Sequence, residues 1–260
     1  MNSVIYYFSA TGNSLKVARD LAQGVGDTQM VRITRHSLAM AHQNEYQRVG
    51  IVFPVYYYGM PLMVTHFVEQ LQLNPGAYVY AAATCGGSVG AALKQLKRIL
   101  EGKGASLSAA FTVVMPDNYQ VMYAPPPLKK RKQLFEQEKK KTVEMAAIVT
   151  RSEKKVWDEK GALAAKLLGG LIARTFHPKG KDQHFWTDER CNGCSICFKV
   201  CPSGNIIMRN QQPQWLHQCE HCLGCMHWCP QTALQYKKGT LKRERYHHPD
   251  VQVDELFIEA

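Results

Sequence analysis

Several features that would place the chain in a common class are missing from its sequence. No basic leader precedes an apolar segment at the start, so we expect no secretory signal and a cytoplasmic location. The longest apolar stretch begins at Gly161, is shorter than a membrane-spanning helix, and carries Lys166 and Arg174. This interrupted pattern favours a packed amphipathic helix over a helix on a membrane surface, and it predicts no stable membrane insertion.

The glycine motifs of the commonest nucleotide-binding folds are also absent. The sequence contains neither a Walker loop, which ends in G-K-S/T, nor G-x-G-x-x-G. Nucleotide hydrolysis and a dinucleotide fingerprint therefore have no support. With 45% hydrophobic and 20% charged residues, the composition is that of an ordinary folded protein, and 260 residues suit one sizeable domain and a small second one.

Cysteine is scarce outside one region near the end of the chain. Cys85 stands alone, whereas the other eight cysteines form two copies of C-x2-C-x2-C-x3-C-P. The three-residue spacing and the missing export signal favour metal ligation over disulfides. Three cysteines at this spacing wrap one cubane cluster, while the fourth points to the other cluster. The predicted ligand sets are Cys191, Cys194, Cys197 and Cys229 for one 4Fe-4S cluster, and Cys219, Cys222, Cys225 and Cys201 for the second.

Two structural zinc sites with four cysteines each are the alternative for this region. Zinc ribbons usually separate two C-x2-C pairs by a long spacer and do not require the third cysteine or the proline, so the pattern favours iron-sulfur clusters. Gly193 and Gly224 allow backbone amides to approach the sulfurs, while His217, His221 and His227 are expected as neighbours of the clusters rather than ligands. Residues 185–237 closely resemble the bacterial two-cluster ferredoxins, and this resemblance implies low-potential one-electron transfer.

The first part of the chain alternates between apolar strands and helical segments. The expected strands cover residues 4–8, 28–33, 48–56, 78–85 and 107–115, and segments with helical spacing separate most of them. Nearly continuous apolar strands indicate a parallel sheet covered on both faces, and a five-stranded doubly wound domain fits.

Beyond Pro125 the sequence becomes polar, basic and helix-prone. One or two long helices are expected there, followed by a helix through Arg174 and a linker that ends near Phe185. The predicted organisation is residues 1–124 for the sheet domain, 125–184 for a helical extension and linker, 185–240 for the cluster domain and 241–260 for a C-terminal tail.

The loop after the first strand, SATGNS, has the composition of an anion site. Its hydroxyls, its glycine and the start of a helix bring backbone amides and the helix dipole toward one point, where a phosphate belongs. A plain helix cap is the alternative. The loop looks like the phosphate loop of flavodoxins, whose usual form is Ser/Thr-x-Thr-Gly-Asn-Ser/Thr, and the matching residues are Ser9, Ala10, Thr11, Gly12, Asn13 and Ser14.

Two further loops stand where flavodoxins hold the isoalloxazine ring. They follow the third and fourth expected strands, and doubly wound folds bind ligands at the carboxyl ends of parallel strands. We therefore expect FMN, with the further binding residues Pro54, Val55, Tyr56, Tyr57, Tyr58, Gly59, Thr84, Cys85, Gly86 and Gly87. One of the three tyrosines is expected to stack on the flavin, and Cys85 to be a small residue beside it rather than a redox thiol.

The phosphate loop contains no lysine or arginine. Neutral dipoles would then bind the phosphate dianion, and its unneutralised charge disfavours the addition of electrons, so we expect a low flavin potential. The residues from Met115 to Tyr119, after the last expected strand, either add a flank to the pocket or form a simple turn.

The whole pattern resembles a family of flavodoxin and ferredoxin fusions found in anaerobic bacteria and archaea, over residues 1 to about 240. The predicted fold class is α/β, with a flavodoxin-like doubly wound five-stranded parallel sheet, extra C-terminal helices, and a small α+β two-cluster ferredoxin domain. We expect an intracellular electron-transfer protein that passes low-potential electrons between two 4Fe-4S clusters and FMN, and on to or from a redox partner. No catalytic residue is assigned.

The alternative is an FMN-dependent reductase that acts directly on a small organic substrate, with the ferredoxin domain as its electron feed. It needs an acid near the flavin, for which Asp117, Tyr119 and the three tyrosines are the local candidates. A redox-responsive regulator is a weaker alternative because no recognition-helix motif is evident.

Acidic residues are outnumbered, with 21 Asp and Glu against 32 Lys and Arg and a formal net charge of +11. Two clusters and a flavin phosphate would reduce this excess to about +5. The basic residues concentrate at 129–132, 139–141 and 237–245, in stretches typical of solvated helix faces or tails. We expect a redox partner protein, with an acidic surface as one candidate, and no nucleic acid; the oligomeric state is left open.

Overall fold

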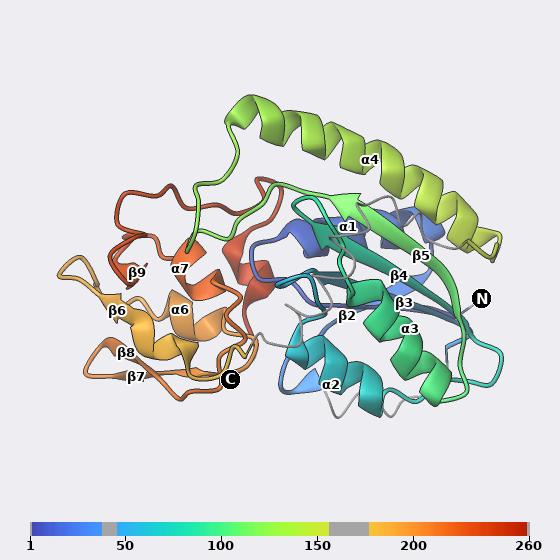
Figure 1. The fold of residues 1–260 in the computed structure, drawn as a ribbon, viewed down its shortest axis with the longest axis horizontal. Helices are drawn as coiled ribbons and strands as arrows, with labels where there is room; N and C mark the ends of the chain where they lie inside the picture. The colour runs from blue at the N-terminus through green and yellow to red at the C-terminus, as the bar shows by residue number, and fades with distance from the viewer. Residues whose placement is uncertain (1, 38–45, 156–176, 259–260) are drawn as a thin grey trace.

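The computed structural model describes residues 2–37, 46–155 and 177–258. Its N-terminal part is a sheet of five parallel strands in the order β2-β1-β3-β4-β5 (Figure 1). The strands are β1 (Ser3–Tyr7), β2 (Thr28–Arg32), β3 (Arg48–Pro54), β4 (Tyr78–Cys85) and β5 (Leu107–Val114). This confirms the predicted doubly wound sheet. Its strand order reverses between β1 and β3, which opens a crevice at their carboxyl ends.

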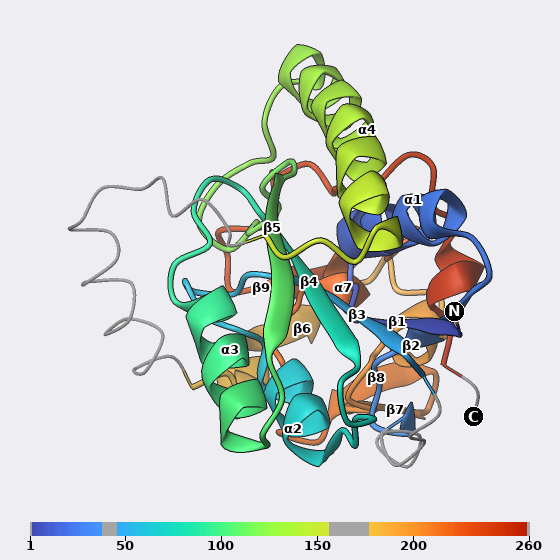
Figure 2. The ribbon, with the colours of Figure 1, turned by 90° about the vertical axis from the view of Figure 1, so that its right-hand side faces the viewer.

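Helices cover both faces of the sheet. α1 (Asn13–Val25) and α4 (Leu128–Thr150) lie on one face, and α2 (Leu62–Gln70) and α3 (Ala92–Gly102) lie on the other (Figure 2). Successive residues of β1 enter opposite cores, with Tyr6 on the α2 and α3 side and Ile5 on the α1 and α4 side. A strand buried on both faces needs apolar residues throughout, which explains the near-continuous hydrophobic runs.

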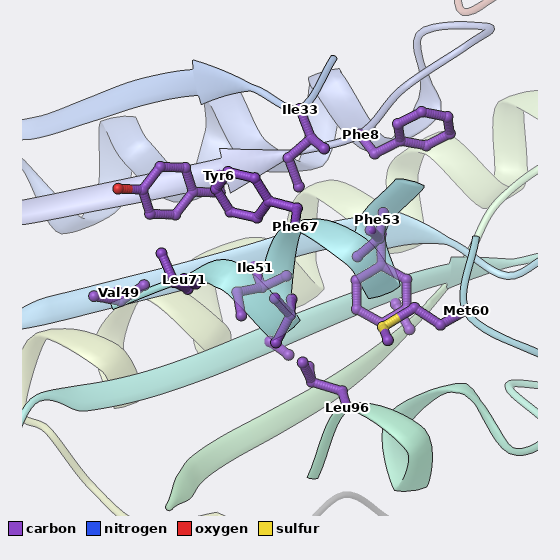
Figure 3. Packing of buried hydrophobic residues seen from close by; sticks show 14 of the residues in the cluster. Tyr6, Phe8, Ile33, Val49, Ile51, Phe53, Met60, Phe67, Leu71 and Leu96 are labelled. Atoms are coloured by element: carbon purple, nitrogen blue, oxygen red, sulfur yellow. The ribbon is translucent and has the colours of Figure 1, made fainter. Parts of the chain in front are cut away.

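Large side chains fill the core between the sheet and α2. The ring centroids of Tyr6 and Phe67 lie 4.8 Å apart, and Phe53 of the central strand belongs to the same cluster (Figure 3). On the opposite face α1 packs closely against α4, because Gly24 has no side chain. A Cβ atom at Gly24 would lie 2.6 Å from the Cβ of Ala146.

The long helix α4 confirms that the segment after Pro125 is helical, and Pro127 immediately precedes its first residue. Its lysines at 129, 130, 132 and 139–141 are exposed. Arg131, expected on the same solvated face, is instead buried. Its guanidinium donates to both carboxylate oxygens of Glu244, at 2.6 and 2.7 Å, and this ion pair compensates its charge. The expected helix through Arg174, with the apolar stretch from Gly161, lies outside the described residues. Within the described ranges, no helix combines the length and apolar character needed to cross a bilayer.

The C-terminal part is built from short elements and lies beside the carboxyl ends of the sheet strands (Figure 1). β6 pairs with β9 and β7 with β8, both antiparallel, and two one-turn helices pack between them. This is the small α+β domain that the sequence predicts. Its elements are η2 (Lys181–His184), β6 (Phe185–Thr187), α6 (Ile196–Lys199), β7 (Ile206–Arg209), β8 (Gln212–Trp215), α7 (Gly224–His227) and β9 (Leu234–Tyr236).

The two cysteine motifs fold into copies of one loop. The residue two positions after the first cysteine has φ +70° at Gly193 and +53° at His221. The residue before each short helix has φ +63° at Ser195 and +61° at Leu223. Equivalent positions therefore share the left-handed backbone conformation even where the residue is not glycine. The repeat in the sequence is a repeat in the structure.

Residues 241–258, here called the C-terminal segment, were expected as a tail but pack against the sheet domain. Their side chains Tyr246, His248, Val251 and Leu256 are buried, and η3 (Val253–Leu256) ends the segment's regular structure. Val251 and Leu256 belong to the core beneath α1 and α4, as do Val200 and Trp228 of the small domain. The two parts of the chain therefore share a hydrophobic core.

Candidate functional site

The loop between β1 and α1 offers several hydrogen-bond donors to an anion. Residues 9–14 are all buried, and the first turn of α1 contains no acidic residue. The first N–H groups of any helix lack an intrahelical acceptor. The Ser9 hydroxyl is buried and has no hydrogen-bond partner within the described ranges. A phosphate would accept hydrogen bonds from such donors, so the loop fits the phosphate of a flavin mononucleotide.

Side chains of this loop tie it to other segments rather than capping α1. Gly12 occupies the N-cap position, where no side-chain cap is present. Ser14 Oγ lies 2.8 Å from Thr84 Oγ1, and Asn13 Nδ2 donates to Pro116 O at 3.1 Å. Thr11 Oγ1 accepts from Asn118 Nδ2 at 2.6 Å. The plain helix cap considered as an alternative is therefore not the role of these side chains.

Gly12 allows the loop to turn beneath the C-terminal segment. Its φ is +96°, and a Cβ atom there would lie 3.0 Å from the Cβ atoms of both His248 and Val251. The backbone N–H of His248 donates to Thr11 O at 2.8 Å, and the Tyr246 hydroxyl donates to Asn13 Oδ1 at 2.6 Å. The C-terminal segment therefore supports the phosphate loop from behind.

A cavity of about 650 Å³ opens at the carboxyl ends of the strands, a volume suited to a cofactor. It brings together every flavin residue predicted from the sequence except Gly12 and Gly59. Gly12 faces the C-terminal segment instead, and Gly59 closes a turn. The predicted residues that line the cavity are Ser9, Ala10, Thr11, Asn13, Ser14, Pro54, Val55, Tyr56, Tyr57, Tyr58, Thr84, Cys85, Gly86 and Gly87.

The three consecutive tyrosines form a tight turn at the cavity wall. Tyr56 and Gly59 exchange both backbone hydrogen bonds, at 2.8 and 2.9 Å. Tyr57 and Tyr58 between them have φ of +47° and +61°, a conformation that costs non-glycine residues about 1–3 kcal/mol each. The Tyr57 hydroxyl meets that of Tyr119, and their rings stand edge to face with centroids 5.1 Å apart. The turn holds aromatic rings at the site at the expense of local backbone strain.

The loop after β5 forms the outer wall and mouth of the cavity. Asp117 accepts from the Tyr123 hydroxyl at 2.7 Å and from the Tyr119 backbone N–H at 3.2 Å. Burial and the Asp117 carboxylate raise the pKa of Tyr123, so its hydroxyl stays protonated. Met122 is 66% exposed and Tyr123 42% exposed, so the mouth is an apolar surface. The expected flank from Met115 to Tyr119 does line the cavity.

The second cysteine motif completes the inner wall of the same cavity through His221, Cys222 and Leu223. Trp228, six residues after Cys222, donates its indole N–H to Ala10 O at 2.8 Å. Burial, reinforced by the neighbouring Cys222 thiol, holds the pKa of Tyr56 well above its usual range. The cysteine loop of one domain therefore lies directly on the ligand loops of the other.

Two of the histidines expected near the clusters are buried at this junction. His227 Nε2 contacts Asn118 O at 2.9 Å, and His227 Nδ1 accepts from the Tyr246 N–H at 3.1 Å. These partners require the neutral form with its proton on Nε2, in agreement with burial that lowers the pKa of His227 to about 3. Burial likewise lowers the pKa of His221 to about 4. His217 lies further out, where its Nδ1 is 2.9 Å from Asp182 Oδ1.

The structure brings each predicted set of four cysteines together. Cys191, Cys194, Cys197 and Cys229 line one small cavity. In the other set, burial and the nearby thiols of Cys222, Cys201 and Cys219 raise the pKa of Cys225 well above its usual range. In the described part of the chain no three His, Cys, Asp or Glu side chains are arranged to hold one metal ion.

Backbone N–H groups point at the sulfurs of the second set. His221 N–H donates to Cys219 Sγ at 3.1 Å, and Asn205 N–H donates to Cys201 Sγ at 3.3 Å. Hydrogen bonds of this kind favour added negative charge on a cluster and help to set its potential. Because burial raises the pKa values of Cys219 and Cys222, loading with iron must displace protons from these thiols.

Comparison with protein families gives two matches. A model described as a flavodoxin domain matches residues 4–120, and a model described as a 4Fe-4S dicluster domain matches residues 174–243. The chain joins a flavodoxin domain to a dicluster domain. FMN is the cofactor implied by the flavodoxin domain, and 4Fe-4S clusters are those implied by the dicluster domain. The protein is a redox flavo-iron-sulfur protein.

A search of curated proteins finds no match. Among solved structures, a putative flavoprotein from Bacteroides uniformis is 22% identical, with 44% of this chain and 90% of the other covered and a TM-score of 0.35. Rubredoxin oxygen:oxidoreductase from Desulfovibrio gigas is 21% identical over 58% of this chain and 37% of its own, with a TM-score of 0.40. A flavodoxin from the domain Archaea is 18% identical over 57% and 99%, with a TM-score of 0.38.

Sequence reasoning missed several residues of the flavodoxin cavity. Met122 and Tyr123 lie beyond the last strand in a stretch without periodicity, so no pattern placed them at the mouth. His221 and Leu223 were assigned to the dicluster domain, and nothing in their spacing indicates that this loop faces the flavodoxin domain. The two motifs do differ at these positions. His221 and Leu223 are bulky and have positive φ, whereas the first motif has the small residues Gly193 and Ser195 at the equivalent positions.

Proposed function

We propose that the protein is an electron carrier that exchanges electrons between a redox partner and the flavodoxin pocket through the dicluster domain. When bound, each of two 4Fe-4S clusters exchanges one electron and FMN exchanges one or two, so the pair of domains can convert between the two kinds of chemistry. The supporting observation is that His221, Cys222 and Leu223 line the same cavity as the phosphate loop and the tyrosine turn.

The residues proposed to hold each group follow from where they lie. The phosphate loop, Ser9 to Ser14, would bind the FMN phosphate, while residues 54–59 and 84–87 would flank the flavin ring. Cys191, Cys194, Cys197 and Cys229 would hold one cluster, here called the outer cluster. Cys201, Cys219, Cys222 and Cys225 would hold the other, here called the inner cluster.

Exposure suggests which cluster faces the partner. Cys194 of the outer set is exposed, whereas Cys201 and Cys225 of the inner set are buried. Cys222 of the inner set borders the flavodoxin cavity. Electrons would therefore enter at the surface near Cys194 and reach the flavin loops beside Cys222. Because the two domains share one chain, each stays at high effective concentration near the other.

Anaerobic purification followed by assay of iron, sulfide and flavin tests this proposal. About eight irons and one FMN per chain are expected. Cys194→Ser should deplete the outer cluster and slow electron exchange with a protein donor while FMN remains bound. Cys222→Ser should deplete the inner cluster and disconnect FMN reduction from the remaining cluster. Cys85→Ser, outside both sets, should keep the full iron content. Zinc in place of iron, or unchanged iron in both ligand variants, would contradict the proposal.

A second candidate is direct reduction of a small planar organic substrate. It is favoured by the apolar mouth, where Tyr58, Met122 and Tyr123 are exposed beside the cavity and the Tyr123 hydroxyl bonds to Asp117. Rapid reoxidation of the reduced protein by a small organic acceptor alone would support this candidate. Reoxidation that requires a partner protein would support the carrier.

A further inference from the structure

A partly buried arginine lies at the junction of the two domains. Arg32 is the last residue of β2, and its guanidinium donates to three backbone carbonyls from different segments. Nη2 lies 3.3 Å from Ser9 O in the phosphate loop and 3.3 Å from Val200 O, the residue before Cys201. Nη1 donates to Leu256 O in the C-terminal segment.

The charge of Arg32 has no carboxylate partner among the residues that the structure describes. Its Nε is also buried there without a hydrogen-bond partner. Burial lowers the pKa of Arg32, while Tyr7 and the thiols of Cys222 and Cys201 oppose that effect. A guanidinium remains protonated in proteins, so a positive charge sits in the junction. An isolated buried charge is costly unless an opposite charge lies near it.

The proposed inner cluster would place negative charge beside Arg32, because Arg32 Nη2 donates to Val200 O and the next residue is the proposed ligand Cys201. Among the charged groups that influence Arg32 are Cys201 and Cys222, both proposed ligands of that cluster. Four thiolates on a 2+ core give about −2, and reduction by one electron gives about −3. A partly buried cation beside a ligand-bearing segment favours the more negative state, because Coulomb energies grow where water is largely excluded.

We propose that Arg32 sets the reduction potential of the inner cluster, by stabilising the state with one added electron. This inference rests on the proposed function, because it requires the inner set to hold a cluster. It assigns Arg32 a positioning and electrostatic role, since the residue touches ligand-bearing segments and does not line the cavity. The phosphate loop itself contains no basic residue, but Arg32 reaches the Ser9 carbonyl of that loop from β2.

The test compares the potentials of both clusters in variants of the full-length, anaerobically loaded protein. Dithionite supplies the electrons in a potentiometric titration, one for each cluster, and electron-spin spectra follow each cluster separately. In Arg32→Met the equilibrium constant for reducing the inner cluster should fall at least tenfold, which is 59 mV for a one-electron couple. The outer cluster should keep its potential. If Arg32→Met does not fold, Arg32→Gln takes its place, and we expect the same fall in the equilibrium constant for reducing the inner cluster.

Two further variants separate charge from packing. Arg32→Lys keeps the charge and loses the planar fork, so it should lower stability and leave the inner potential close to that of the parent. Arg48→Met is the matched control, because Arg48 is buried and also donates to a backbone carbonyl, Thr150 O at 3.1 Å, but lies at the start of β3. It should lower the unfolding midpoint without moving either potential.

The outcomes distinguish this inference from the proposed function. If the parent protein binds no clusters, the proposed function fails and the inference fails with it. If the parent binds both clusters and Arg32→Met unfolds more easily with both potentials unchanged, the proposed function stands and Arg32 is a structural clamp. If Arg32→Lys shifts the inner potential as far as Arg32→Met, the charge is not the cause and the inference is wrong.

Discussion

At the scale of single residues, the junction depends on side chains that are small or locked in one state. Gly12 leaves room for His248 and Val251 to approach the phosphate loop. His227 is held neutral between a carbonyl of the β5 loop and an N–H of the C-terminal segment. Each of these residues contacts a segment that lies more than 100 positions away in the sequence. His227, for example, contacts Asn118. Small local changes should therefore affect both domains.

Gly12→Ala should weaken FMN binding and destabilise the fold. The new methyl group would meet His248 and Val251 at 3.0 Å and would occupy a backbone with φ +96°. Gly26→Ala is the matched control, because Gly26 also has positive φ, at +74°, but no atom lies within 4 Å of its Cβ position. Positive φ costs a residue with a side chain about 1–2 kcal/mol, and overpacking adds about 1–3 kcal/mol at Gly12.

Urea unfolding and FMN titration of both variants check this prediction. Gly26→Ala should show the backbone cost alone and retain the FMN affinity of the parent. Equal destabilisation by the two substitutions, with equal FMN affinity, would mean that the C-terminal segment does not press on the phosphate loop.

At the scale of elements, α4 buries one carboxyl group against α1. Glu138 is 1% exposed, and neither carboxylate oxygen has a hydrogen-bond partner within the described ranges. Burial, reinforced by Asp20, raises the pKa of Glu138 from 4.5 to about 7, while Lys16 and Lys139 oppose the shift. A basic helix that looks solvated along its length thus carries a buried acid on its inner face.

This acid makes stability depend on pH in a defined window. The folded protein holds the Glu138 proton up to about pH 7, whereas the unfolded chain releases it near 4.5. Folding is therefore favoured most below pH 4.5, and that contribution is lost as the pH rises toward 7, by up to about 3 kcal/mol. Glu138→Gln should be more stable than the parent at pH 8 and close to it at pH 4.5. Glu136→Gln, on the exposed face of the same helix, should leave the pH profile unchanged.

Chemical denaturation at pH 4.5, 6, 7 and 8 supplies the measurement. A Glu138→Gln profile that runs parallel to that of the parent would show that Glu138 is already ionised throughout this range in the folded protein.

Regular elements were predictable because their sequence patterns are physical requirements. A strand such as β4, Tyr78–Cys85, is buried on both faces and must be apolar throughout. The cysteine motifs were predictable because cluster geometry dictates their spacing. The loop contacts had no such pattern. Arg245, within the basic stretch taken as solvated, donates to Leu234 O at 2.7 Å and Gln120 Oε1 at 3.1 Å. Such contacts depend on how the two domains meet, which periodicity and composition do not encode.

At the scale of the whole molecule, the C-terminal segment binds the domains together. Arg19 of α1 contacts Asp250 O and Glu255, while the backbone N–H of Ile258 donates to Lys199 O in the dicluster domain. Leu256 is fully buried in the core that also contains Val200 and Trp228. The domains are therefore expected to unfold together rather than as independent units.

Leu256→Ala should weaken the coupling between the two domains. It removes a fully buried side chain from the shared core, at a cost of about 2–5 kcal/mol. Leu241→Ala is the matched control, since Leu241 is 46% exposed and its truncation should change stability by less than about 0.5 kcal/mol. Thermal unfolding monitored by far-UV circular dichroism and by cluster absorbance should coincide in the parent and separate in Leu256→Ala. Coincident transitions in Leu256→Ala would show that other contacts suffice to couple the domains.

The support that His248 and Val251 give to Gly12 also bears on the order of biosynthesis. The phosphate loop is translated among the first residues of the chain, but the side chains behind it emerge more than 230 residues later. A ribosome-bound nascent chain can form the sheet early. The contacts of His248 and Val251 behind Gly12 can form only after residue 251 has left the exit tunnel. FMN binding would then follow translation of the cysteine motifs, so that an incomplete chain does not bind the flavin.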